Sequence, residues 1–139
     1  MFSEDYVIRL VRRLGDFLAR IVGKRNSKDF EGAIAEAGKA WDELLGHPRE
    51  IVEVVDTPTL ASMLREPERM RLASRLLLEE GHAHTGKGDP GQAAGCYRRA
   101  TELVLEARAL DPSPEDEAAL LELGRLISMN LLDERYRQG

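Results

Sequence analysis

The sequence predicts an all-α protein of five to seven helices: two helical hairpins, a short helical connector between them and a C-terminal helix that closes the fold. Apolar residues recur at steps of three and four along several segments, which is the spacing of one face of a helix. Glycine and proline stand between these segments, where helices end and begin. No segment alternates apolar and polar residues convincingly, as a half-buried strand does. With 139 residues, the chain is expected to form one domain with its own core.

Residues 1–46 are predicted to form a basic N-terminal hairpin. Its first helix is expected to begin after an N-cap at Ser3, to cover residues 5–22 and to end at Gly23. Its second helix is expected over residues 28–45. The first helix carries a continuous apolar stripe of Val7, Leu10, Val11, Leu14, Phe17, Leu18, Ile21 and Val22.

Residues 47–66 are predicted to be a connector of two short helices. The β-branched residues between positions 51 and 55 also suit a strand. A strand needs a partner, however, and no other segment offers one, so a short helix over residues 48–55 is favoured. The second short helix is expected to open at Thr57 and Pro58, because proline suits the first turn of a helix.

Residues 67–112 are predicted to form a central hairpin whose turn is the clearest local signal in the chain. Gly86 and Gly88 are expected to end the first helix, because glycine adopts the left-handed conformation without strain. Asp89 is expected to cap the second helix, and Pro90 suits the first position of that helix.

Small residues predict a close approach of the two central helices. Ala93, Tyr97 and Ala100 share one face of the second helix, and Gly81 leaves space on the first. This spacing resembles a tetratricopeptide repeat, through Leu77, Glu80, Gly81, His84, Ala93, Tyr97, Ala100 and Pro112. The chain departs from that pattern where Glu80 replaces the usual leucine, where His84 replaces the usual aromatic residue, and in the length of its second helix.

The N-terminal hairpin is predicted to be a second, lengthened repeat of the same kind. Ala33, Ala37 and Ala40 repeat the spacing of the small and aromatic residues on the second central helix, and Gly15 stands in its helix as Gly81 stands in the first central helix. The gap from Gly15 to Ala33 is eighteen residues, against twelve in the central hairpin.

Residues 113–139 are predicted to form a C-terminal helix that caps the hairpins. Ser113, Pro114 and Glu115 make a helix start signal, and leucine and isoleucine recur from position 120 to 131 with helical spacing. The tail from Arg135 is expected to be frayed.

Three stretches resemble an uncharacterised bacterial family of small helical proteins: DYVIRL at 5–10, LARI at 18–21 and WDELLG at 41–46. In that family a basic N-terminal hairpin precedes a tetratricopeptide-like hairpin. The resemblance covers most of the chain. It implies a bacterial cytoplasmic setting and brings no known activity.

Charge and composition exclude several classes of function. The formal charge of −5 divides into +4 over residues 1–28 (seven basic against three acidic) and −9 over the rest (thirteen against twenty-two). An acidic body with few aromatic residues argues against binding to nucleic acid. Cys96 is the only cysteine, so no internal disulfide can form, which fits a reducing cytoplasm. Neither a membrane span nor a signal peptide is expected.

The tetratricopeptide resemblance implies a partner-binding face on the first central helix. In such repeats the first helix of each hairpin lines a concave groove, and carry-over by position gives Arg75, Leu78, His82 and Thr85 as partner-binding residues. This set lacks the Lys/Asn pattern with which some members clamp the terminal carboxylate of a peptide. Two hairpins make only a short groove, and the alternative is that these side chains are merely solvated.

The predicted function is therefore a protein-interaction module with a protein or peptide partner, and self-association to a homo-oligomer is part of this hypothesis. The alternative is a peripheral protein that binds anionic membranes or phosphate through the first helix. That helix carries Arg9, Arg12, Arg13, Arg20 and Lys24 beside its apolar stripe. An ordinary core helix with a solvated cationic face is the simpler interpretation.

No metal, cofactor or catalytic site is predicted. His82, His84 and Cys96 are residue types that bind zinc, but side chains two positions apart on a helix point about 200° apart. Metal ligands on a helix favour spacings of three or four, and no clear fourth ligand is evident. The chain also has no Gly-rich phosphate loop and no nucleophile beside a base, so it is not expected to be an enzyme.

Overall fold

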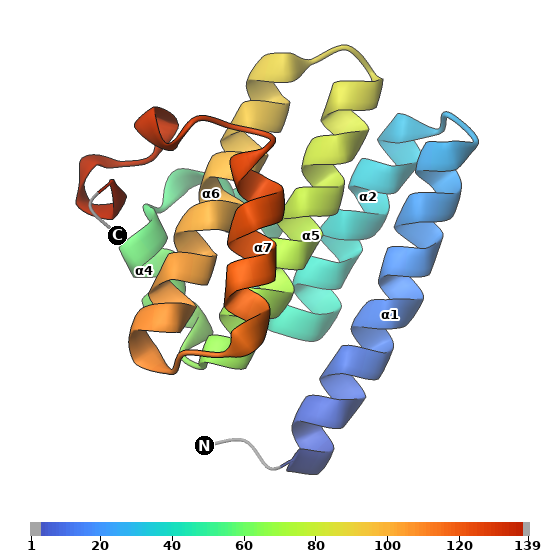
Figure 1. Cartoon of the computed structure of the whole chain (residues 1–139). Coiled ribbons are helices and arrows are strands. Elements are labelled where there is room, and N and C mark those ends of the chain that lie inside the picture. Colours follow the sequence, from blue (N-terminus) through green and yellow to red (C-terminus); the bar gives the residue numbers. More distant parts are fainter. Residues whose placement is uncertain (1–3, 138–139) are drawn as a thin grey trace.

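The computed structural model describes residues 4–137, and these residues fold into seven α-helices without a strand (Figure 1). The helices are α1 (Glu4–Asn26), α2 (Phe30–Ala40), α3 (Arg49–Val54), α4 (Thr57–Leu64), α5 (Pro67–Gly86), α6 (Pro90–Leu110) and α7 (Pro114–Gly124). A π-helical turn, Trp41–Leu45, extends α2, and short 3-10 turns at Met129–Leu131 and Glu134–Tyr136 follow α7. The predicted all-α class is confirmed. The β-branched run lies mostly in α3.

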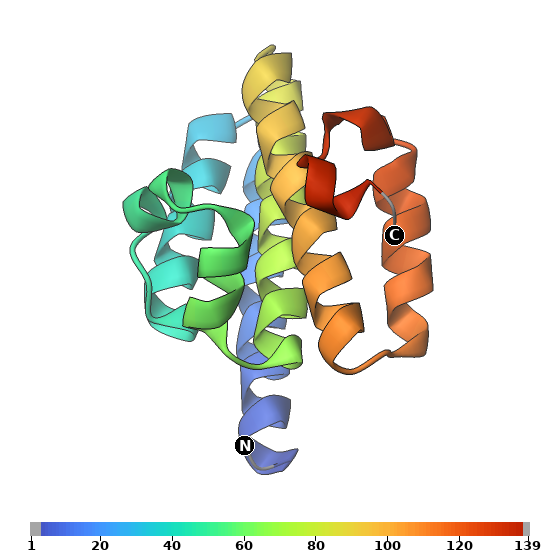
Figure 2. The ribbon, with the colours of Figure 1, turned by 90° about the vertical axis from the view of Figure 1, so that its left-hand side faces the viewer.

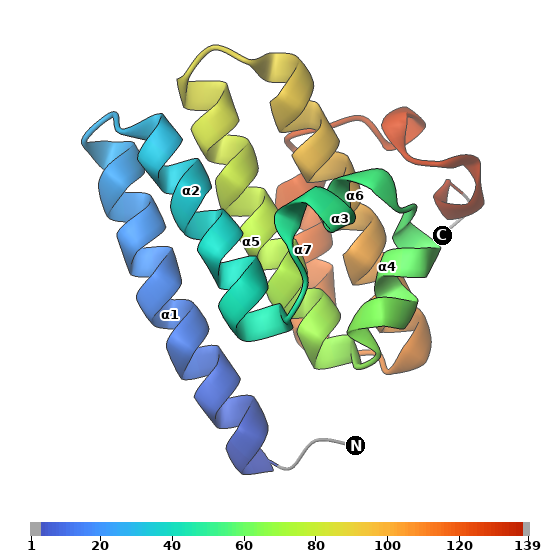
Figure 3. The same cartoon turned by 180° about the vertical axis from the view of Figure 1, so that it is seen from behind.

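The long helices run in alternating directions. α1, α5 and α7 run one way while α2 and α6 run back, so α1 with α2 and α5 with α6 form antiparallel pairs (Figures 1 and 3). α3 and α4 lie on one side of α5 and α6, and α7 lies on the other side (Figure 2). α5 holds the centre, because it packs against α1, α2, α4 and α6.

α5 and α6 pack tightly at Gly81. A Cβ atom at this position would lie 2.5 Å from Cε1 of Tyr97, which is closer than real Cβ contacts come. Ala93, Tyr97 and Ala100 are all buried in the same interface. Both the predicted shared face of α6 and the predicted space at Gly81 are confirmed.

The turn between α5 and α6 also forms as predicted. Gly88 has a φ of +84°, in the left-handed region that favours glycine. Asp89 accepts a hydrogen bond from the backbone N–H of Gln92, and Pro90 opens α6. α5 ends at Gly86, and the ring of Phe30 in α2 packs against this glycine. This end of the hairpin therefore contacts α2.

The first helix is longer than predicted. α1 continues through Gly23 to Asn26, because the chain turns only afterwards, where Lys28 adopts a φ of 66°. Asp29 then caps α2 by accepting a hydrogen bond from the Gly32 N–H. The predicted N-cap at Ser3 lies outside the described residues.

The predicted equivalence of Gly15 with Gly81 is wrong. A Cβ atom at Gly15 would meet nothing within 4 Å, and the residue is exposed. In the central hairpin, Gly81 lies twelve residues before Ala93. The residue twelve positions before Ala33 is Ile21, which is buried and is not a glycine. The register of the first antiparallel pair therefore differs from the register of the second, although Ala33 is buried as expected.

The C-terminal helix is shorter than predicted, and the tail is not frayed as far as Arg137. α7 ends at Gly124, and the apolar residues beyond it belong to a loop that folds back over α6. Leu132 and Tyr136 of this loop are buried. The backbone N–H of Asp133 donates to the buried carboxylate of Glu102 at 2.8 Å, and the Tyr136 hydroxyl donates to Glu106 at 2.6 Å. Specific hydrogen bonds therefore hold residues of the tail that its terminal position predicts to be frayed.

Candidate functional site

A groove runs between α1, α5 and α7, and α5 forms its floor. It encloses about 310 Å³ and is bordered by Leu18 of α1, by Leu78 and Arg75 of α5, and by Ala119 and Leu123 of α7. The floor and walls are apolar where they meet the core, because Leu18, Leu78 and Ala119 are partly buried against it. Two of the four residues predicted to bind a partner, Arg75 and Leu78, thus border one cavity.

The rim of this groove is acidic. Four carboxylates border it, against the guanidinium groups of Arg71 and Arg75, which gives a net charge of −2. The carboxylates belong to Glu79, Glu115, Asp116 and Glu122. Glu79 is paired with Arg25 of α1 at 3.1 Å, whereas Glu122 forms no ion pair with another residue from 4 to 137. The groove therefore favours a ligand that carries positive charge.

Arg71 and Asp116, which both border the groove, are paired with each other. Arg71 donates from Nε to Oδ1 of Asp116 at 2.8 Å and from Nη2 to Oδ2 at 3.0 Å. These bonds raise the pKa of Arg71 and lower the pKa of Asp116, whose other contact is the N–H of Ser113 at the start of α7. Arg75 lies one turn further along α5 and forms no ion pair with any other described residue.

The other two predicted residues, His82 and Thr85, do not border the groove. Both contact the hydroxyl of Tyr97, at 2.8 Å from Nδ1 of His82 and 3.1 Å from Oγ1 of Thr85. Burial lowers the pKa of His82, against the nearby carboxylates of Glu79 and Glu122, which raise it. These two residues hold Tyr97 in the α5–α6 interface, so they have a packing role that the resemblance to a repeat did not indicate.

Sequence reasoning missed the two walls of the groove. Leu18 was assigned to the core stripe, and Ala119 and Leu123 belonged to a helix expected only as a cap. Their apolar spacing predicts a helix face but not the neighbour that this face meets. Only the packing of α7 against α6 brings Ala119 and Leu123 near Leu78 of α5.

The cationic face of α1 is largely neutralised by its own hairpin. Three of its five predicted cations lie near carboxylates: Arg13 with Glu43 at 3.7 Å, Arg20 with Glu36 at 3.1 Å and Lys24 with Asp29 at 3.8 Å. Arg9 and Arg12 form no ion pair with another described residue. They lie beside the exposed side chains of Ile8 and Val11.

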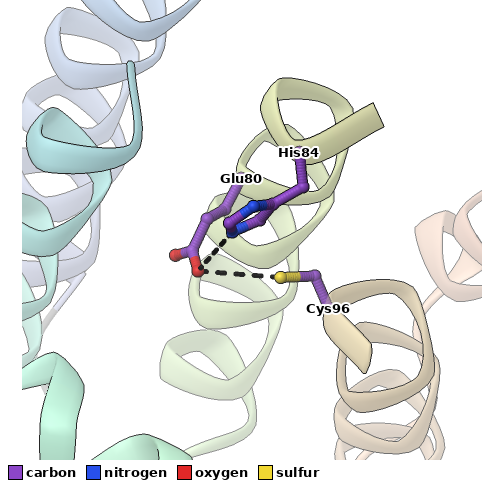
Figure 4. A group of neighbouring side chains, drawn as sticks. All are labelled: Glu80, His84 and Cys96. Carbon is purple, nitrogen blue, oxygen red and sulfur yellow. Dashed lines mark hydrogen bonds and ion pairs between the residues drawn. The ribbon is translucent and has the colours of Figure 1, made fainter. Parts of the chain in front are cut away.

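A second, buried cluster lies where α3, α5 and α6 meet. Glu80 and His84 of α5 point toward Cys96 of α6 (Figure 4). Oε2 of Glu80 is 3.6 Å from Sγ of Cys96 and 4.0 Å from Nε2 of His84. His84 and Cys96 therefore converge, whereas His82 does not join them.

Arg49 neutralises the carboxylate of this cluster, and the thiol of Cys96 is protonated. Arg49 of α3 donates to both oxygens of Glu80, at 3.1 Å from Nε and 2.8 Å from Nη2. Burial raises the pKa of Cys96 to about 12, and the charge of Glu80 adds to this rise. The thiol is thus protonated at neutral pH and is not a reactive nucleophile.

Comparisons with known protein families, with curated proteins and with solved structures found no match to this chain. Within the described residues, no helix combines the length and the apolar character that crossing a membrane requires.

Proposed function

We propose that this protein is an interaction module that holds a segment of a partner protein in the groove between α1, α5 and α7. The observation that supports it is the position of Arg75, which has no ion-pair partner among residues 4–137 and borders the groove beside the apolar side chain of Leu78. An arginine next to apolar surface is typical of the residues that dominate protein–protein contacts.

The chemistry of the groove defines the partner segment. Apolar side chains of that segment would occupy the space between Leu18, Leu78 and Ala119, and lysine or arginine would face the rim, whose net charge is −2. A single acceptor group of the segment, such as a carboxylate or a backbone carbonyl, would accept hydrogen bonds from the guanidinium group of Arg75. The expected partner is therefore a basic, amphipathic segment.

The resemblance to tetratricopeptide repeats supports the same proposal. In such repeats the first helices of successive hairpins line the binding face. α1 and α5 are the first helices of the two antiparallel pairs, and both border the groove. Within this proposal α7 acts as a capping helix that also supplies one wall. The bacterial origin and the cytoplasmic location remain predictions.

The test is affinity capture from the native cells with the tagged protein and with the double variant Arg75→Glu, Leu78→Asp. The matched control is Lys39→Glu, Val54→Asp, which changes the charge equally on α2 and α3, outside the groove. Circular dichroism checks that each variant is folded. We expect a partner that the control retains and the groove variant loses, and a basic segment of that partner should bind in calorimetry. Equal capture by the groove variant would contradict the proposal.

We also propose that a second copy of the chain can be a partner. Leu121 is 62 % exposed and Met129 is 44 % exposed, and they border an apolar hollow shared by α6, α7 and the following loop. A second copy that covered this surface would remove both apolar side chains from water. Light scattering should show a dimer that Leu121→Glu converts to monomer, whereas a wild-type protein that stays monomeric at high concentration would disprove self-association.

Binding to an anionic surface through α1 is the second candidate function. Two observations favour it. Arg9 and Arg12 follow the exposed Ile8 and Val11 in the chain, and the N-terminal end of α1 extends beyond the neighbouring helices (Figure 1). Salt-sensitive binding to anionic vesicles that is lost in Arg12→Glu, Arg13→Glu would support it. No binding at low salt would end it.

A further inference from the structure

We propose that Glu80, His84 and Cys96 form a binding site for a divalent transition-metal ion, with zinc as the expected ion. The ligand atoms of these three residues all lie within 4.8 Å of one another (Figure 4). Ligand atoms around tetrahedral zinc lie roughly 3.3–3.8 Å apart, given bonds of about 2.0–2.3 Å. Side-chain movements of about 1 Å would therefore close the site around an ion.

The spacing on α5 suits such a site. Glu80 and His84 are four residues apart, so they project from the same face of the helix one turn from each other. The geometric objection that excludes His82 with His84 does not apply to this pair. His82 points elsewhere and binds Tyr97 instead.

Cys96 reaches the site because α5 and α6 pack closely at the next residue along each helix. Glu80 precedes Gly81, and Cys96 precedes Tyr97, whose ring lies against Gly81. The missing Cβ at Gly81 thus lets α6 approach near enough for the thiol to lie 3.6 Å from Oε2 of Glu80. Both the thiol and the carboxylate are buried.

The donor set points to zinc rather than to calcium or magnesium. A thiolate, an imidazole and a carboxylate are all zinc ligands, whereas calcium and magnesium prefer oxygen alone. The imidazole of His84 is also unused by the protein. Its Nδ1 is buried without a hydrogen-bond partner, and its Nε2 reaches Glu80 only at 4.0 Å.

The space beside the ligands and the charge of Arg49 both affect metal binding. A cleft of about 100 Å³ lies beside Cys96 and Arg49 and offers room for water as the fourth ligand. Binding replaces the S–H bond of Cys96 by a bond from sulfur to the metal, and the proton leaves to solvent. Arg49 orients the carboxylate of Glu80, as partners of metal ligands do, but its positive charge opposes a cation.

The test uses the purified full chain, freed of metal with a chelator and then titrated with Co²⁺. We expect one equivalent to bind with a thiolate-to-cobalt charge-transfer band, and Zn²⁺ should displace it. Cys96→Ser should lose the band, and His84→Gln should weaken binding at least about tenfold. His82→Gln, two residues away, is the matched control and should bind as the wild type does.

Glu80→Gln provides an independent test, because it removes the charged ligand and leaves the thiol and the imidazole in place. It should weaken Co²⁺ binding at least about tenfold. Circular dichroism confirms that each variant is folded. No charge-transfer band in the wild type, or a band that His84→Gln leaves unchanged, would overturn the proposal, because the latter would indicate binding to the thiol alone. The outcome does not depend on the groove, which the site does not share.

Discussion

The guanidinium of Arg71 and the carboxylate of Asp116 are joined by two parallel hydrogen bonds, at 2.8 Å and 3.0 Å, and this pair fastens α7 to α5. Asp116 is only 1 % exposed, so its charge depends on Arg71 for compensation. The same carboxylate accepts from the N–H of Ser113 and so also caps α7. One buried pair at the border of the groove thus fixes the start of α7.

Arg71→Ala should lower the free energy of unfolding by about 3 kcal/mol, because it leaves a buried carboxylate without its partner. Urea denaturation measures this loss. Arg108→Ala is the control, since its pair with Glu117 at 3.3 Å is largely exposed and should contribute less than about 1 kcal/mol. Equal effects of the two substitutions would show that the Arg71 pair has no special structural role.

The contribution of Asp116 should depend on pH. Arg71 lowers the pKa of Asp116 below 3.8, so the unfolded state binds a proton more readily than the folded state does. The stabilisation is therefore complete above the unfolded pKa and is lost as the pH falls through the lower folded pKa. Urea denaturation of the wild type and Asp116→Asn from pH 7 to pH 2 should show a stability difference that shrinks below about pH 4. A constant difference would contradict this linkage.

Gly81 and Gly15 should respond in opposite ways to alanine. Gly81→Ala places a Cβ 2.5 Å from the Tyr97 ring and should cost about 1–3 kcal/mol, because the ring must leave its contacts. Gly15→Ala meets nothing within 4 Å in an exposed helical position, and should stabilise the protein by about 0.5–1 kcal/mol. If Gly15→Ala also destabilised the protein, the two glycines would be equivalent after all.

Leu132→Ala should lower the free energy of unfolding by about 2–4 kcal/mol, although it lies in an irregular loop near the C-terminus. Leu132 is fully buried, while its neighbour Leu131 is 53 % exposed. Leu131→Ala is therefore the control and should have an effect below about 0.5 kcal/mol. Thermal denaturation distinguishes the two, and similar small effects would mean that the loop does not contribute to the core.

Features written into short stretches of the chain were predicted best. The turn from Gly86 to Pro90 combines a left-handed glycine, a capping aspartate and a proline, each of which acts on its own neighbours. The shared face of Ala93, Tyr97 and Ala100 follows from helical spacing alone. The sequence predicts that α1 ends at Gly23, but the helix continues to Asn26. A glycine inside a helix lowers the stability of the helix without ending it.

Of the four residues that the repeat pattern indicates, Arg75 and Leu78 border the groove. His82 and Thr85 turn to Tyr97 instead, an interaction between two helices that no spacing within α5 reveals. A metal was excluded from the sequence by pairing His82 with His84. Glu80, which the sequence shows only as a departure from the repeat pattern, is buried against Arg49 beside His84 and Cys96.

By itself the sequence determined the helical class, the central hairpin with its turn, and the residues that face the core of that hairpin. These depend on backbone conformation and on side-chain periodicity, which act over a few residues. Only the tertiary structure decided which helix faces meet. It placed Ala119 opposite Leu78, brought Cys96 to Glu80, and folded Leu132 back into the core. Such contacts join segments far apart in the chain, and they are selected by shape and charge across an interface that no single stretch encodes.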